Sequence, residues 1–510
     1  MGLFNKNHGL ALLAGAMCVF GFSPFGIFVI PVLALAALFS LWLRADSART
    51  AAWLGLSFGL GLFSAGIGWI YIAMYEYGDM PLLLALLATL LFAAFWALLP
   101  ALAGFVQARF TGATWLRIML VMPAVWALLE WFRGLLVTGF PWLTLGYAHS
   151  DSPLAGYAPL LGVYGVSFAA AVSAGSLLLF WRSRWSKQGK LALLLLLSVW
   201  GLGALLRTVV WTQPFGEPFS VVLVQGNIPQ NLKFNEDALV GTLETYRRLV
   251  EQNSARLTVL PETALPLHRH EVPQGLIEKL RGHVRQNGGD VLIGAFERNN
   301  GSYYNSVFSL GVADEQHYRK QHLVPFGEFI PLRPLFGWLI NSVLDIPMGD
   351  LARGDAIQAP LAVAGQQVAV NICYEDVFGE EIIRALPQAT LLVNVTNDAW
   401  YGNSPVAAQH NQIAQLRAQE TGRMMLRATN TGVTSIIGAN GKVLQQLPQH
   451  EEGVLLGMAQ GFQGITPYVR WGNAAILLLL VALLAYAWAR RNSSFLPPSA
   501  PSPAGGRGLG

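Results

Sequence analysis

The chain has 510 residues, of which 53% are hydrophobic and only 12% are charged, whereas ordinary soluble domains carry about 25% charged residues. This composition excludes a purely water-soluble enzyme and an intrinsically disordered chain. The net charge of +4 is too small to indicate nucleic-acid binding, and two cysteines cannot form a disulfide framework.

The charge is distributed unevenly along the chain. Residues 1–211 and 471–510 together carry +9, whereas residues 212–470 carry −5. We therefore predict a polytopic α-helical membrane protein with one water-soluble α/β domain inserted near its C-terminal end. The predicted parts are a membrane domain of seven helices at 1–211, the soluble domain at 212–470, a last transmembrane helix at 471–491 and a disordered tail at 492–510.

Eight apolar runs are long enough to cross ~30 Å of hydrocarbon. The runs lie at about 8–22, 25–43, 51–74, 81–107, 115–137, 157–181, 191–211 and 472–489. Only residues 23–26 separate the first two runs, so one long helix is the main alternative there. In the fifth run Glu130 and Arg133 lie one turn apart and are expected to form a structural pair inside the bundle. Cys18, in the first run, is expected to be inert and packed against helices or lipid.

The loops between these runs indicate an orientation. Basic residues fall on one side only, which the positive-inside rule identifies as the cytoplasm. They are Lys6, Arg44, Arg49, Arg109, Arg117, Arg182, Arg184, Lys187, Lys190, Arg490 and Arg491. Loops on the other side carry Glu76, Asp79 and Asp151. With eight spans both termini are cytoplasmic, and residues 212–470 lie outside the inner membrane, in the periplasm, if the protein is bacterial.

The inserted domain shows the alternation of a mixed α/β fold with one core. Short β-rich runs lie at 221–224, 257–260, 291–295, 368–373 and 391–395, with polar helices at 236–253, 271–287 and 406–428. The turn Asn440-Gly441 predicts a hairpin over 435–444.

Three residues with reactive or charged side chains lie at the ends of predicted strands or beside a predicted turn of this domain. Glu262 comes directly after the strand at 257–260, Lys320 precedes a turn that ends at Glu328, and Cys373 ends the strand at 368–373. A thiol, a carboxylate and an ammonium suit acyl transfer through a thioester, because the thiol needs a base and the oxyanion needs a cation. Each also has a structural reading: Cys373 as a core residue, Glu262 as a helix cap and Lys320 as a solvated charge.

Several spaced motifs in the domain agree with one family. They are Pro261-Glu262-Thr263, Arg319-Lys320 with Pro325-Phe326-Gly327-Glu328, Ile372-Cys373-Tyr374-Glu375-Asp376, Asn397-Asp398-Ala399-Trp400-Tyr401-Gly402, Arg417-Ala418-Gln419-Glu420 and Arg427-Ala428-Thr429-Asn430-Thr431-Gly432. Together they resemble the nitrilase superfamily of carbon–nitrogen hydrolases over nearly all of 219–457. The resemblance implies an αββα sandwich and a triad in which Glu262 is the general base, Lys320 the transition-state stabiliser and Cys373 the nucleophile.

The membrane flanks narrow the resemblance to the bacterial apolipoprotein N-acyltransferase family. Such an enzyme takes an acyl chain from a membrane phospholipid and transfers it to the N-terminal amine of a diacylated apolipoprotein. The resemblance implies a ping-pong reaction through a thioester on Cys373, at the periplasmic side of the bacterial inner membrane, without a cofactor.

Three further residues are expected to support the triad. Glu328 matches a second glutamate of the family motif and is expected to orient Lys320. Tyr374 follows the nucleophile, so its backbone N–H is a natural oxyanion donor. Glu375 is expected to be structural or orienting.

Three further residues and one segment are considered as parts of the site or of the membrane contact. Asn305 either faces the site or is an ordinary polar residue at a strand edge. Phe234 stands where the family can carry tryptophan, so the ring is retained without an indole N–H. Trp142 either lines the outward mouth of a lipid cleft or anchors the chain at the membrane interface, and we favour anchoring. The apolar segment at 329–340 is either a membrane-contacting lid or buried core.

Two other functions compete with lipid acyl transfer. A membrane-tethered amidase or nitrilase that hydrolyses a small carbon–nitrogen substrate has the same triad. An enzyme with a soluble substrate, however, does not need eight membrane spans. A transporter is disfavoured because the spans contain few ionisable residues. His268, His270 and His322 lack a recognised metal-ligand spacing, so no metal is expected.

Overall fold

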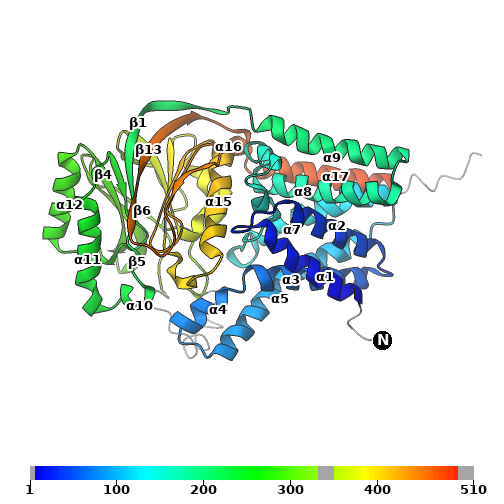
Figure 1. Ribbon diagram of the computed structural model, residues 1–510, viewed down its shortest axis with the longest axis horizontal. Helices are drawn as coiled ribbons and strands as arrows, with labels where there is room; N and C mark the ends of the chain where they lie inside the picture. Colours follow the sequence, from blue (N-terminus) through cyan, green and yellow to red (C-terminus); the bar gives the residue numbers. More distant parts are fainter. Residues whose placement is uncertain (1–5, 331–349, 492–510) are drawn as a thin grey trace, which may run out of the picture.

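The computed structural model describes residues 6–330 and 350–491 and divides them into a helical bundle and a two-sheet α/β domain (Figure 1). Each of the eight apolar runs contains at least one helix. The bundle helices are α1 (Lys6–Met17), α2 (Val29–Leu43), α3 (Ala48–Gly66), α4 (Ile70–Ile72) continued by the π-turn η2 (Ala73–Tyr77), α5 (Leu82–Ala108), α6 (Thr114–Leu116) continued by η3 (Arg117–Val121) and α7 (Met122–Arg133), α8 (Ala158–Ser183), α9 (Lys187–Leu206) and α17 (Ala474–Arg490).

The predicted number of eight membrane-spanning helices is not confirmed by helix length and composition among the described residues. By length and composition four described helices qualify, and a fifth does if α3 and the segment Ile70–Tyr77, which meet at 56°, form one span. The four are Leu82–Ala108, Thr114–Arg133, Pro153–Ser183 and Lys187–Leu206. α2 and α17 are apolar but have only 15 and 17 residues, and α1 has 12. The apolar runs therefore overstate helix length, because turns interrupt or end several of them.

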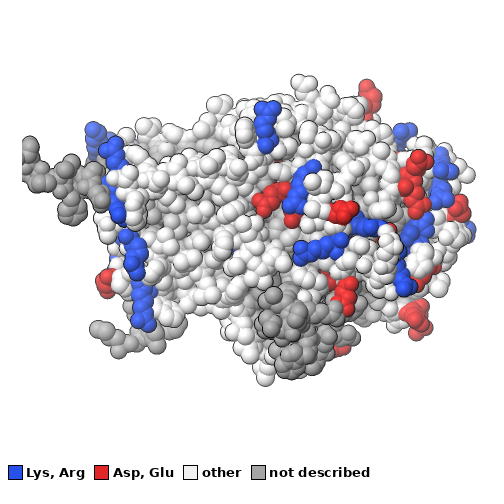
Figure 2. Space-filling model, turned by 180° about the vertical axis from the view of Figure 1, so that it is seen from behind, with Lys and Arg blue, Asp and Glu red and all other residues white. Residues whose placement is uncertain are grey.

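The surface of the bundle carries its charges at one end. Figure 2 shows Lys and Arg gathered at the end farthest from the α/β domain, mixed charges over the α/β domain, and a nearly uncharged surface between them. Arg44, Arg109 and Arg184 cap the ends of α2, α5 and α8, Lys187 begins α9, and Arg490 ends α17. An uncharged band with a basic edge is the surface expected of a bundle in a bilayer.

The α/β domain contains two stacked sheets. One has the order β13-β1-β2-β4-β5-β6, with β3 paired to β4, and the other has the order β12-β11-β10-β9-β8-β7. The first is built from β1 (Thr212–Gln225), β2 (Leu257–Val259), β3 (Leu265–His268), β4 (Asp290–Asn299), β5 (Ser302–Gly311), β6 (His317–Arg319) and β13 (Gly453–Gly464). The second is built from β7 (Leu361–Val363), β8 (Gln366–Ile372), β9 (Leu391–Thr396), β10 (Met425–Thr429), β11 (Ser435–Ile437) and β12 (Val443–Gln446).

Alternation along the strands makes the layers. In β1, Val221 and Leu223 face the other sheet, whereas Val222 and Val224 face α11 (Glu236–Glu251) and α12 (Gln274–Gln286), as the two-residue period of a strand requires. The second sheet packs its outer face on α15 (Val406–Thr421) through Leu392, Met425 and alanines of the helix. The order of layers is helix, sheet, sheet, helix.

α15 also joins the domain to the bundle. All but one of its 16 residues are buried, because one side packs on the sheet and the other on the bundle. Its glutamines bond to bundle groups, with Gln412 accepting from Ser23 N at 2.9 Å and Gln419 donating to Ser150 O at 2.8 Å. The predicted helix at 406–428 was too long: Gly422, at φ +62°, ends α15, and β10 follows at the centre of the sheet.

Candidate active site

Three strand or sheet connections bring the predicted triad together. Glu262 follows β2, Lys320 follows β6, and Cys373 follows β8 in the facing sheet and begins the 3-10 turn η7 (Cys373–Val377). The turn at Glu262 lies close to β4, where a Cβ on Gly294 would come within 2.4 Å of Pro261 O. A glycine is therefore required opposite this turn.

Two carboxylates and one ammonium form a buried cluster. Lys320 Nζ lies 3.3 Å from Glu262 Oε1 and 2.9 Å from Glu328 Oε1, and all three side chains are at most 8% exposed. Asn305 Nδ2 donates to both carboxylates, at 2.7 Å to Glu262 and 3.1 Å to Glu328. Asn305 thus faces the cluster, which is the first of its two readings. Burial by itself would lower the pKa of Lys320, but the two carboxylates hold it well above its usual value.

Two groups that the sequence did not single out hold Glu262 from other sides. The backbone N–H of Asn397 donates to Glu262 Oε2 at 2.9 Å, and the buried Lys233 donates from Nζ to Glu262 O at 3.0 Å. Burial lowers the pKa of Lys233 to about 8, against the opposing effect of Glu262. Phe234, beside it, is 39% exposed, with its ring 6.4 Å from that of Phe296. In this segment the contact with Glu262 therefore comes from Lys233 and not from Phe234.

Cys373 occupies a strained turn. Its φ is +52°, a left-handed conformation that non-glycine residues rarely adopt and that is found at nucleophile turns. Its carbonyl accepts from Asn394 Nδ2 and lies at the same distance, 3.2 Å, from His410 Nε2. Burial and then the Glu262 carboxylate raise the pKa of the Cys373 thiol well above its usual range, while Lys320 opposes them. The resting group is a thiol, so a base must remove its proton.

Glu375 ties two of the three turns together. Its Oε1 accepts from Gln321 N at 2.7 Å and His322 N at 3.1 Å, and its Oε2 accepts from Ile372 N at 2.6 Å. The Tyr318 hydroxyl donates to the same carboxylate at 3.0 Å. These contacts connect the segment that follows Lys320 to the strand that precedes Cys373, and they fit an orienting role. Burial raises the pKa of Glu375 to about 7.

The nucleophile turn contacts the helical bundle. The Tyr374 hydroxyl donates to Gly139 O at 3.1 Å, and its ring stacks on Trp142 at 6.5 Å. Trp142 is only 4% exposed and donates from Nε1 to Gln409 Oε1 at 2.7 Å. The expectation of an interfacial anchor is wrong for Trp142, because its indole is enclosed between bundle and domain and reaches no lipid.

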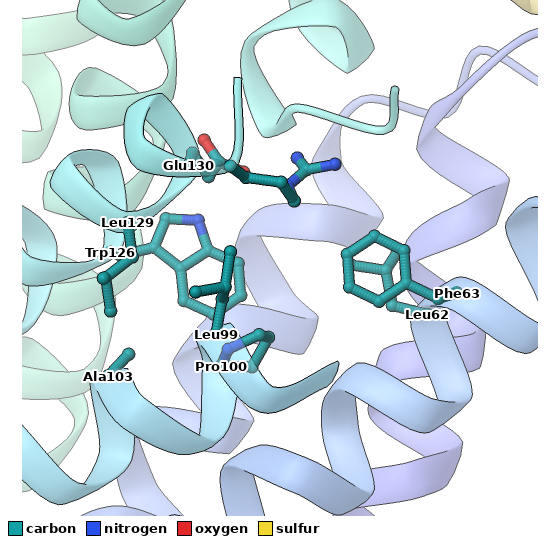
Figure 3. A pocket seen from close by; sticks show the side chains of 9 residues that line it. Leu62, Phe63, Leu99, Pro100, Ala103, Trp126, Leu129 and Glu130 are labelled. Atoms are coloured by element: carbon teal, nitrogen blue, oxygen red, sulfur yellow. The ribbon is translucent and has the colours of Figure 1, made fainter. Parts of the chain in front are cut away.

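Charged groups of α7 hold the loop that carries Trp142. Arg133 donates to the carbonyls of Phe140 and Trp142, and Glu130 accepts from Leu145 N at 2.9 Å. A cavity nearby is lined by apolar side chains of α3, α5 and α7, with Glu130 at its edge (Figure 3). Among the described residues Glu130 and Arg133 therefore do not form the expected direct ion pair; each side chain instead bonds the backbone of the same loop. The apolar segment at 331–340 lies outside the described residues.

Two family models match the chain. The model described as carbon-nitrogen hydrolase matches residues 220–460, and the one described as apolipoprotein N-acyltransferase N-terminal domain matches residues 14–176. The α/β domain is therefore a carbon–nitrogen hydrolase domain, as the resemblance implied.

Relatives extend the match over nearly the whole length. The apolipoprotein N-acyltransferase of Nitrosomonas europaea is 51% identical over 95% of this chain and 97% of its own. Those of Ralstonia nicotianae and Methylococcus capsulatus are 46% and 43% identical, each over 94% of this chain and over 93% and 96% of their own. The chain belongs to the apolipoprotein N-acyltransferase family, and it is a membrane protein and an acyltransferase.

Proposed function

We propose that the protein transfers an acyl chain from a membrane phospholipid to the N-terminal amine of a diacylated apolipoprotein, through a thioester on Cys373. The observation that carries this proposal is the position of the nucleophile. The turn that begins at Cys373 packs into the same apolar cluster as the bundle helices, with Tyr374, Val377 and Phe378 among its buried members. A lipid substrate needs a nucleophile beside the membrane part of the molecule. A small soluble amide does not, which disfavours the amidase alternative.

In the first half-reaction Glu262 takes the proton of the Cys373 thiol. The thiolate attacks the ester carbonyl carbon, and the resulting oxyanion is stabilised by Lys320 Nζ and the backbone N–H of Tyr374. When the intermediate collapses, the carbon–oxygen bond of the ester breaks and the leaving lysophospholipid takes the proton from Glu262. Donors placed before the reaction at the position of the oxyanion are worth ~3–4 kcal/mol each.

In the second half-reaction the α-amine of the apolipoprotein attacks the thioester. Glu262 removes a proton from the amine, the amide bond forms, and the carbon–sulfur bond breaks. The departing thiolate recovers its proton from Glu262, which restores the resting site. Glu328 and Asn305 keep Lys320 and Glu262 in place through both halves, and Glu375 holds the two turns that carry Lys320 and Cys373.

The location follows from the charges of the bundle. The basic edge faces away from the α/β domain, so the α/β domain lies on the opposite side of the bilayer. This arrangement supports cytoplasmic termini and a periplasmic catalytic domain at 212–470 in a bacterial inner membrane. The shorter helices α1, α2 and α17 are included as membrane segments, which makes eight crossings in total.

Acyl transfer is tested with purified protein in detergent and a phospholipid labelled in its acyl chain. We expect a hydroxylamine-sensitive label on the wild-type protein that chases onto a diacylated lipopeptide. Cys373→Ser should carry no such label, whereas Cys18→Ser, at the only other cysteine, should label normally. A Cys373→Ser protein labelled at the wild-type level contradicts the mechanism.

The orientation is tested separately with reporters fused near Asn253, in the α/β domain. A reporter that is active only in the periplasm should be active at this position. Activity confined to a reporter that works only in the cytoplasm contradicts the proposed orientation.

A further inference from the structure

Beneath the nucleophile turn, four charged side chains form a closed ring. His410 Nε2 lies 2.8 Å from Asp376 Oδ1, and His410 Nδ1 lies 2.9 Å from Asp398 Oδ1. Arg427 closes the ring from the other side, with Nη1 3.1 Å from Asp376 Oδ2 and Nη2 3.2 Å from Asp398 Oδ2. All four side chains are at most 2% exposed. The proposed reaction uses none of them.

The geometry of the ring fixes the charge of His410. Both of its ring nitrogens face carboxylate oxygens, which only accept hydrogen bonds unless they are protonated. Each nitrogen must therefore carry a hydrogen, and the side chain is an imidazolium. Burial and Arg427 would lower the pKa of His410, but Asp376 and Asp398 outweigh them and raise it to about 9. The ring then contains two cations and two anions, and its net charge is zero.

The ring is connected to the nucleophile through the backbone. His410 Nε2 lies 3.2 Å from Cys373 O as well as near Asp376, so its hydrogen is shared between the two acceptors. Asn394, which also bonds Arg427 through its own oxygen, donates to Cys373 O from the neighbouring strand. Asp376 belongs to the turn that Cys373 begins. The strained turn is therefore held from its carbonyl side.

The same histidine faces the membrane part of the molecule. Its ring lies 5.4 Å from that of Trp142, and it is carried by α15, the helix that docks on the bundle. The groups packed around His410 thus come from η7, from Asp398 in η9 (Asp398–Tyr401), from β10 and from the loop of Trp142.

We propose that His410 is a positioning residue for the nucleophile: as an imidazolium it holds the carbonyl of Cys373 and keeps the left-handed turn in the geometry that acyl transfer needs. The proposal rests on the proposed function for its catalytic consequence. Two effects follow when the cation is removed. The turn loses one of its two carbonyl donors, and the ring keeps a net charge of −1 close to the thiol, which disfavours the thiolate.

The test compares His410→Gln with His149→Gln, the same change at a second buried histidine, whose Nδ1 contacts Ser152 in the bundle. Thioester formation from labelled phospholipid should fall on the order of 10²-fold in kcat for His410→Gln, with KM unchanged, because a small displacement of the attacking atom is enough. Alkylation of Cys373 by iodoacetamide should shift its pH midpoint upward by about one unit. His149→Gln should keep wild-type values in both assays.

The two assays distinguish the two hypotheses. A wild-type protein that forms no thioester contradicts the proposed function, while the alkylation profile still reports on His410. A folded His410→Gln protein with the wild-type rate and alkylation profile overturns the positioning role. If that variant does not fold, ¹⁵N spectra of histidine-labelled wild-type protein decide. One of the nine histidines should keep both ring nitrogens protonated at pH 8, and the absence of such a signal overturns the proposal.

Discussion

Two buried charge clusters lie on either side of Cys373 and differ in how completely they are paired. In the ring of Asp376, His410, Asp398 and Arg427, every charged group bonds two neighbours of opposite sign. In the cluster of Glu262, Lys320 and Glu328, one ammonium serves two carboxylates, and the nearby thiol is neutral at rest.

The difference separates a structural task from a chemical one. The charges of Asp376, His410, Asp398 and Arg427 are balanced, and the two carboxylates raise the pKa of His410 to about 9, so this imidazolium keeps its proton between pH 6 and pH 8. The cluster of Glu262, Lys320 and Glu328 has spare acceptor capacity, which lets Glu262 take and return a proton. Mutations in the ring should lower stability and should act on the rate only through the geometry of the turn, whereas mutations in the cluster should act on the rate directly.

The largest effect is expected for Lys320→Met. The oxyanion loses its cation, so kcat should fall about 10³-fold, or about 4 kcal/mol in the barrier. The free energy of unfolding should fall by less than the barrier rises, because one of the two adjoining carboxylates can bind a proton once the ammonium is gone. Rates and thermal unfolding are compared with Lys279→Met, an exposed lysine of α12. A Lys320→Met enzyme that retains a tenth of the wild-type rate contradicts the role of this cation.

Arg427→Met tests the ring. The change leaves two buried carboxylates with one imidazolium, and the free energy of unfolding should fall by about 3 kcal/mol. Denaturation of the detergent-solubilised protein measures the loss, with the exposed Arg256→Met as a control that should remain within about 0.5 kcal/mol. Equal losses in the two variants would mean that the ring contributes no special stability.

The sequence predicted the reactive cluster better than the ring. Glu262, Lys320 and Cys373 each follow a short apolar strand or lie beside a recognisable turn, and such turns project side chains at one edge of a sheet. His410 lies within a helix whose glutamines, asparagine and arginine resemble a solvated surface. Those polar residues are buried because α15 is enclosed by a sheet on one side and the bundle on the other. Periodicity along a single helix does not report that second partner.

The fold was predicted in its layers but not in its boundaries. The alternation of strands and helices predicted a mixed α/β domain, and the resemblance to the nitrilase superfamily implied the sandwich. Five strands were located to within a few residues or fell inside longer ones. Hydrophobic runs in the bundle, however, predicted eight spans without indicating where helices break, as between Gly66 and Ile70. The environment of Trp142 was predicted wrongly for a related reason. The sequence shows only that this aromatic residue lies near the end of an apolar run, whereas its hydrogen-bond partner Gln409 is 267 residues away.

Lys233→Met should have a smaller effect than Lys320→Met. Its ammonium holds the backbone of Glu262 rather than the oxyanion, so kcat at pH 7 should fall about 10-fold. With a pKa of about 8, Lys233 is charged below that pH, and the wild-type rate should decline as it loses its proton. Because of the same lowered pKa, the unfolded chain binds more protons than the folded protein between about pH 8 and 10.5. The free energy of unfolding should therefore rise with pH over that range. Pre-steady-state acylation across pH 6–10 is the measurement, and an unchanged upper limb in Lys233→Met contradicts the assignment.

The smallest effect is expected for Trp142→Phe, which acts on the nucleophile turn and on the ring from the bundle side. The ring contacts to Tyr374 and His410 are largely kept, but Gln409 Oε1 loses its indole donor. A buried acceptor left without its partner costs about 1 kcal/mol, so stability should fall by that amount. Trp181→Phe, an exposed residue at the end of α8, is the control. If Trp142→Phe instead reduced thioester formation as strongly as His410→Gln, the indole N–H would itself hold the nucleophile turn. The bundle loop that carries Trp142 would then belong, with the ring, to the structure that fixes this turn.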